Sequence, residues 1–307
     1  CPDLLEWAFK GNLSGDDFGL GLKFEDGVVV RHAAKLFLDD TSLLAKSNRH
    51  MQCTVDAYLS YAHKWRFNLH LGKFQYMICK RGAHTDVLNM QGRSGTVCVT
   101  AKPHCTLLGS KLDATFSGRI ALEHWKSTIS QNLPLVKEVR NHLGKRWALH
   151  ALTKKIEPKA YYGAEAAWVK DHQLHKLDTS CTIPGLKTAF AVPRRENGKA
   201  VLYEAQVPWA LAQVTLAQTR QFLRIAWGGH AHRKRLLKHC FRAGAHPALQ
   251  RYRDRVSQGL ELLDLDPESM LDCPPPSKLV RASVRKRLRT AALQKQADTL
   301  QQGLGAL

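Results

Sequence analysis

The stretch that decides the fold is residues 27–45, which read GVVVRHAAKLFLDDTSLLA. Apolar and β-branched residues run up to Asp39 and Asp40 and resume directly after them. Two turn-favouring residues between two such runs predict a β-hairpin with this acidic pair at its tip. Adjacent carboxylates raise each other's pKa, and a bound divalent cation such as Mg²⁺ removes that cost. The pair is therefore either a metal site or, in the simpler interpretation, a solvated turn.

The segment after the hairpin predicts a helix. From about Ser47 to Trp65, apolar residues recur at three- and four-residue steps, as expected for an amphipathic helix packed on the hairpin sheet. Asn48 is a suitable cap near the start of this helix.

Further short strands are predicted beyond the helix. Apolar residues alternate over 67–71, and an apolar run covers 76–79. Residues 80–103 are polar and glycine-rich, whereas 105–109 predict a strand that ends in a tight glycine turn. The result is a β–α–β order around the acidic pair.

From about residue 115 the spacing of apolar residues becomes helical. It predicts one helix around 120–133, a second that stops before Pro158 and a third that opens at Tyr161. Residues 184–199 carry proline, glycine and charges, and are predicted to be a linker. The next helical stretch, 209–256, has a dense basic face, formed by Arg220, Arg224, Arg233, Lys234, Arg235, Lys238 and Arg242.

Charge points to a polyanionic partner. The 46 Lys and Arg exceed the 26 Asp and Glu, so the formal net charge is +20. Such an excess favours nucleic acid as a partner, and no apolar run is long enough for a transmembrane helix. The eight cysteines include no Cys-x-x-Cys pair, which favours a reduced, intracellular protein. A zinc site remains an alternative at one cluster, formed by His230, His232, His239, Cys240 and His246.

Several short motifs resemble the reverse transcriptases of non-LTR (LINE-type) retrotransposons. Residues 37–40, Phe-Leu-Asp-Asp, are similar to the aromatic-x-Asp-Asp signature of their palm hairpin. Trp65, followed by Lys73, resembles the next block of the family, in which a lysine lies close to the incoming nucleotide. Residues 107–109 resemble the strand-turn of the primer grip, and 158–168 resemble a thumb segment.

The resemblance implies an α+β fold. We expect a partial polymerase palm, with a small antiparallel sheet and a packed helix, followed by a helical thumb and a mostly helical C-terminal region. The expected divisions are a partial palm over 1–112, a helical thumb over 113–180, a basic helical region over 181–273 and a basic C-terminal arm over 274–307.

The resemblance also implies roles for particular residues. Asp39 and Asp40 become catalytic metal ligands for Mg²⁺ or Mn²⁺, and Lys73 becomes a catalytic residue near the nucleotide. The partners are an RNA template, a DNA primer and the rest of the polymerase, with no membrane, in an intracellular and nuclear location. Together with the basic face, the motifs give a nucleic-acid-binding set of Phe37, Leu108, Gly109, Arg119, Arg233, Lys234 and Arg235.

The sequence departs from the family in one respect that bears on activity. The third metal-binding Asp of the family lies on an earlier strand, and only 38 residues precede Asp39 here. Asp16 and Asp17 are adjacent, but their Ser-Gly-Asp-Asp-Phe-Gly context predicts a turn. We therefore expect a fragment of an RNA-directed DNA polymerase that does not polymerise alone. The alternative is a basic nucleic-acid-binding module without chemistry, and a weaker one is a terminal arm that contacts a membrane or a partner helix.

Overall fold

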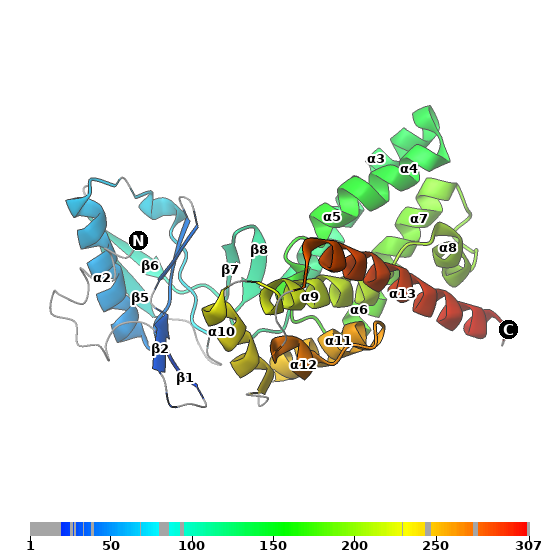
Figure 1. The fold of residues 1–307 in the computed structure, drawn as a ribbon. Helices are drawn as coiled ribbons and strands as arrows, with labels where there is room; N and C mark the ends of the chain where they lie inside the picture. Colours follow the sequence, from blue (N-terminus) through cyan, green and yellow to red (C-terminus); the bar gives the residue numbers. More distant parts are fainter. Residues whose placement is uncertain are drawn as a thin grey trace. The chain divides into compact units, whose positions relative to one another are not determined.

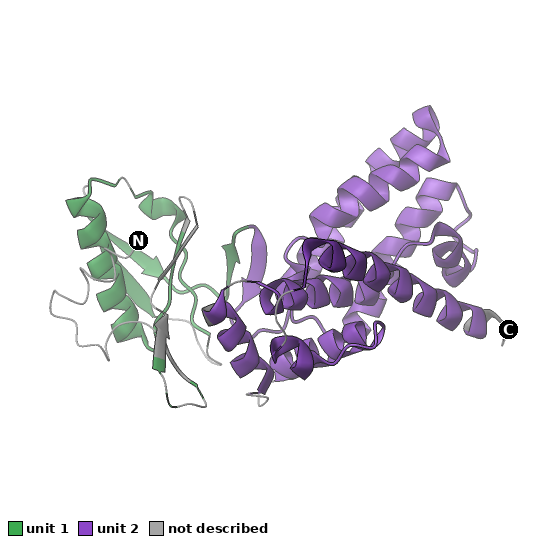
Figure 2. Cartoon of the chain, in the orientation of Figure 1, with its two compact units in different colours: residues 1–108 green, residues 109–307 purple. Residues whose placement is uncertain are grey.

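A computed structural model describes residues 20–24, 27, 29–32, 34–37, 40–67, 69–79, 86–92, 95–228, 230–242, 247–272 and 276–305. The chain divides into two compact units, residues 1–108 and residues 109–307 (Figure 2). Helices dominate, and the strands pair in two-stranded sheets (Figure 1). The fold class is α+β, as expected.

Unit 1 consists of hairpins and one long helix. Strands β1 and β2 are antiparallel, as are β3 with β4 and β5 with β6. The elements of unit 1 are β1 (Leu20–Lys23), β2 (Val29–His32), β3 (Ala34–Phe37), β4 (Asp40–Leu43), α2 (Asn48–Lys64), η1 (Leu71–Lys73), β5 (Val87–Gly92), β6 (Gly95–Thr100) and β7 (His104–Leu107).

The predicted hairpin is confirmed in its strands. Ala34 lies opposite Leu43, and Phe37 lies opposite Asp40, the first residue of β4. The helix after it is also confirmed, within one residue at each end. Its cap is Ser47 rather than Asn48, because the Ser47 hydroxyl accepts the His50 backbone N–H at 3.2 Å.

Helix α2 packs mainly on β5 and also contacts β4. The polar, glycine-rich stretch 80–103 therefore contains a strand pair that composition did not predict, and β5 supplies Leu88 and Met90 to the core beside Val55. The two strands predicted before it are wrong. Of residues 67–71, the described ones, 67 and 69–71, form no strand and lead into η1, and 76–79 contribute only a single parallel bridge from Met77 to Lys102.

Unit 2 is a helical assembly that begins with the short strand β8. Its elements are β8 (Ser110–Asp113), α3 (Arg119–Leu143), α4 (Lys145–Ala151), η2 (Leu152–Ile156), α5 (Glu157–Ala160), η3 (Ala164–Ala166), α6 (Asp171–Leu177), η4 (Asp178–Thr182), α7 (Ile183–Phe190), α8 (Gly198–Ala205), α9 (Ala210–Ala226), α10 (Ala231–Arg242), α11 (Pro247–Glu261), α12 (Pro267–Asp272) and α13 (Lys278–Gly305).

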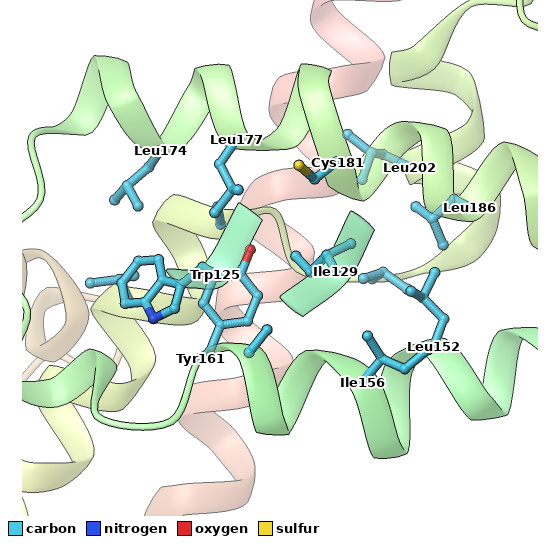
Figure 3. Close-up of a cluster of buried hydrophobic side chains, with 14 of the residues drawn as sticks. Trp125, Ile129, Leu152, Ile156, Tyr161, Leu174, Leu177, Cys181, Leu186 and Leu202 are labelled. Carbon is cyan, nitrogen blue, oxygen red and sulfur yellow. The ribbon is translucent and has the colours of Figure 1, made fainter. Parts of the chain in front are cut away.

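The main core of unit 2 lies where the apolar faces of α3, α6, α7 and α8 meet (Figure 3). Trp125 of α3 is 1% exposed and packs against the Tyr161 ring, with 5.2 Å between the ring centroids. Around this pair are Ile129, Leu152, Ile156, Leu174, Leu177, Cys181, Leu186 and Leu202.

Three predictions about this helical region need correction. The second helix does not stop before Pro158, because a π-helical turn, in which the Glu157 N–H bonds to the Leu152 carbonyl, carries it on to Ala160. Residues 161–168 form a turn with one short 3₁₀ segment instead of opening a helix. The predicted linker 184–199 is mostly helical, since it contributes most of α7 and the start of α8.

The last predicted segment is not detached from the rest of unit 2. Helix α13 contacts α8, α9 and α11, and buries Leu288, Ala292 and Leu300. The buried Gln296 side chain makes two further bonds, because its Oε1 accepts the Trp209 N–H at 2.9 Å and its Nε2 donates to the Val207 carbonyl at 2.8 Å. These bonds satisfy backbone groups at the start of α9.

Two buried carboxyl groups also lie at helix boundaries. Asp178 accepts the Ala210 N–H at 2.9 and 3.1 Å, and so caps the N-terminus of α9. Glu157 accepts a hydrogen bond from the Gln213 side-chain amide at 3.2 Å. Burial raises the pKa of both carboxyl groups to about 7.

Candidate nucleic-acid interface

The acidic hairpin is held against α2. The Thr41 hydroxyl on β4 and the Tyr58 hydroxyl on α2 lie 2.9 Å apart and share a hydrogen bond. Asp40 begins β4 opposite Phe37, for which only the backbone is described, and Asp39 lies outside the described residues. Phe37 and Asp40, the first and last residues of the aromatic-x-Asp-Asp motif, thus lie opposite each other in paired antiparallel strands.

Asp39 and the Asp40 side chain lie outside the described part of the structure, so further metal centres can be recognised only in the rest of the described ranges. Nowhere in the described ranges do three His, Cys, Asp or Glu side chains gather closely enough to hold an ion. Asp16 and Asp17 lie outside those ranges. Carboxylate oxygens are the ligand type that Mg²⁺ prefers, so the chemistry of the acidic pair fits the expected ion.

Lys73 is the last residue of η1 and its side chain is exposed. The Phe74 N–H closes this turn onto the Leu71 carbonyl at 3.0 Å. An anion can therefore reach Lys73 from solvent, and its catalytic role stays a prediction.

The predicted glycine turn lies at residues 108 and 109. Both have positive φ, 48° at Leu108 and 80° at Gly109, which is the pattern of a type I′ hairpin turn. A side chain on Gly109 would meet the Tyr162 ring, 3.0 Å from the position of its Cβ. One on Gly163 would overlap Ser110, 2.2 Å from the hydroxyl oxygen. Gly109, the last residue of the predicted strand-turn motif, thus lies close to the Tyr162–Gly163 segment within unit 2.

Exposure separates the aromatic residues that could stack on bases. Trp125 and Tyr161 are core residues. Trp147 and Tyr162, in contrast, are 56% and 57% exposed. Exposed aromatic rings beside basic side chains are typical of surfaces that bind single-stranded nucleic acid. Tyr162 is therefore the aromatic residue best placed to act together with the glycine turn.

Asp113 organises the chain between this turn and α3. Its carboxylate accepts five hydrogen bonds from the backbone and hydroxyl groups of Thr115, Ser117 and Gly118, over 2.7 to 3.2 Å. Although burial works against it, this set of bonds lowers the pKa of Asp113. Arg119 follows as the first residue of α3, exposed and paired with Glu123 at 2.8 Å.

The basic residues predicted on α10 lie along one short helix. Arg233 is exposed, whereas Lys234 and Arg235 are partly covered. Farther along, Lys238 pairs with Asp272 and Arg242 with Glu268, so acidic residues of α12 neutralise that end of α10. The described members of the His and Cys cluster gather no metal-ligating group of three, and His246 lies outside the described residues.

Sequence reasoning missed a basic pocket between α9 and α13. It assigned Arg220 and Arg224 to one surface and Arg285 to a separate arm, whereas the three line one cavity of about 450 Å³. Burial and the neighbouring charges of Arg289 and Arg285 lower the pKa of Arg220. The four-residue spacing within each helix was visible in the sequence, but the pairing of the two helices was not.

No family model, curated protein or solved structure matches this chain. Within the described ranges, no helix has the length and apolar character needed to cross a membrane.

Proposed function

We propose that this chain is part of an RNA-directed DNA polymerase of a non-LTR retroelement, in which unit 1 carries the acidic hairpin and unit 2 binds template and primer. One observation supports this proposal above the others. Phe37 and Asp40, which begin and end the aromatic-x-Asp-Asp sequence, lie opposite each other in the antiparallel pair β3 and β4, and a hydrogen bond joins Thr41 of β4 to Tyr58 of α2. An Asp-Asp pair in an ordinary surface turn would need neither the strand pairing nor the hydrogen bond to a helix.

The proposed chemistry assigns a task to each residue. Asp39 and Asp40 supply carboxylate oxygens to a divalent metal, which in the complete site activates a primer 3′-hydroxyl and stabilises the leaving pyrophosphate. Exposed Lys73 offers a positive charge to the nucleotide phosphates. Gly109 and Tyr162 of unit 2 meet the primer strand, and Leu108 is assigned to the same strand, while Arg119 and the α10 residues Arg233, Lys234 and Arg235 add positive charge for the duplex.

Metal binding tests this proposal. Mg²⁺ keeps several waters and is commonly held by one or two carboxylates together with substrate phosphates, so calorimetric titration is done with template–primer and a dNTP present. We expect Mg²⁺ binding that Asp39→Asn abolishes and that the control Asp86→Asn, at an exposed carboxylate elsewhere in unit 1, retains. Duplex affinity without metal is expected to be equal in all three proteins.

The metal-binding result also distinguishes the polymerase proposal from the alternative, a basic nucleic-acid-binding module without catalysis. Absence of metal binding in the wild-type chain, with duplex binding intact, would favour a basic binding module. The exposed aromatic rings and the basic pocket of unit 2 are the observations that support such a module. Primer extension with Mg²⁺ and dNTPs adds a second readout: activity abolished by Asp39→Ala would show that a third carboxylate lies within this chain.

A further inference from the structure

Two rows of arginine meet at the pocket between α9 and α13. Arg220 and Arg224 are one helical turn apart on α9, and Arg285 and Arg289 are one turn apart on α13. Residues four apart on a helix are separated by about 6 Å along its axis. The helices are held together by a buried cluster that includes Leu216 of α9, and Leu288 and Ala292 of α13. The two rows are therefore fixed by packing.

The positive charge of these rows is not compensated within the described part of the chain. None of the four arginines has a carboxylate within 4 Å there, and Glu165 is the one acidic residue among those that line the pocket. The pKa of Arg220 is lowered by burial and then by Arg289 and Arg285, so like charges lie close together. An anion in the pocket would relieve this repulsion.

We propose that the α9–α13 pocket binds the phosphodiester backbone of a nucleic-acid strand. This inference rests on the proposed nucleic-acid binding and gives residues 209–305 a defined site in it. The guanidinium fork matches two phosphate oxygens at once. Arg220 is partly covered by its neighbours, but all four arginines keep solvent-exposed surface, so a strand can reach them. Two rows with steps of about 6 Å fit successive phosphates of a chain better than one free phosphate.

Paired substitutions test this proposal on the full chain. R220Q/R224Q removes one row, R285Q/R289Q removes the other, and R194Q/R195Q is the control, because it removes the same charge from an exposed loop of unit 2. Affinity for a 20-nucleotide single strand is measured across salt concentrations by fluorescence anisotropy. Thermal unfolding of each variant verifies that the exposed substitutions leave the fold intact.

Counterion release sets the expected size of the effect. Each lost phosphate contact makes the slope of log affinity against log salt shallower by about 0.7 on single strands. Two lost contacts therefore change the slope by about 1.4 and lower affinity about 15-fold at 0.15 M salt. We expect both pocket variants to show this loss, and the control to lose less than about threefold with a smaller change of slope.

The possible results distinguish the inference from the function on which it depends. If the wild-type chain does not bind the strand, the proposed nucleic-acid binding fails as well. If it binds but both pocket variants match the control, only the pocket assignment is wrong. If inorganic phosphate at constant ionic strength displaces the strand, and binds by calorimetry with the same arginine dependence, the pocket takes a free phosphate and the assignment to a strand is overturned.

Discussion

Gly163→Ala is expected to destabilise unit 2 at the contact between Ser110, the first residue of β8, and Gly163. The new Cβ would lie 2.2 Å from the Ser110 hydroxyl oxygen and 2.7 Å from the Ser110 Cβ, at a backbone φ of +79°. The left-handed conformation costs about 1–2 kcal/mol for alanine, and overpacking adds about 1–3 kcal/mol. The free energy of unfolding should therefore fall by about 2–5 kcal/mol, which lowers the Tm of a unit of this size by about 4–20 °C.

A double-mutant cycle with Ser110→Gly isolates the steric part of this cost. Ser110→Gly removes both clashing side-chain atoms, so Gly163→Ala should cost only about 1–2 kcal/mol in that background. Unfolding in guanidinium, followed by tryptophan fluorescence, gives the four free energies. The reasoning is refuted if the two substitutions are additive within about 0.5 kcal/mol, since Ser110 would then not be what excludes a side chain at position 163.

Three further changes have defined outcomes. Burial, with the charge of Asp178 adding to it, raises the pKa of Glu157 from 4.5 to about 7, so the free energy of unfolding should fall as pH rises through this interval. Glu157→Gln should make this fall smaller. In thermal scans, the variant should unfold at a higher temperature than wild type at pH 8 but not at pH 4. Arg255 is 2% exposed and donates from Nε to Asp171 at 3.1 Å, so Arg255→Ala should cost about 1.5–3 kcal/mol in denaturant unfolding, and a loss below about 1 kcal/mol would contradict this. Tyr162→Ala should weaken single-strand binding by about 1–3 kcal/mol if its ring stacks on a base; unchanged affinity would mean that the ring serves only the packing over the glycine turn.

The sequence predicted best where local patterns coincide with tertiary packing. The acidic hairpin and α2 were predictable, because two apolar runs around a turn and an amphipathic period both have one structural solution. Strands β5 and β6 were not, since their polar and glycine-rich composition hides the few residues, such as Leu88 and Met90, that enter the core. Pro184 suggested a linker, yet it lies in the first turn of α7, where proline is tolerated.

At the candidate site, too, the sequence predicted the local turn but not the contacts between distant segments. Gly109 could be placed in a turn from sequence, because a positive φ suits glycine, whereas the positive φ of Leu108 could not be predicted. The contact of that turn with Tyr162, and of α9 with α13, joins segments that are far apart in the chain. No local pattern encodes such pairings, so the arginine rows were expected on two unconnected surfaces.

The bonds made by Gln296 determine where unit 2 can be shortened. A truncation before this residue would leave the Trp209 N–H and the Val207 carbonyl without their side-chain partners, and would expose the apolar surface that Leu288, Ala292 and Leu300 cover. Any minimal nucleic-acid-binding fragment drawn from this region therefore has to extend past Leu300. A shorter one that failed to bind would report a damaged fold rather than a missing contact.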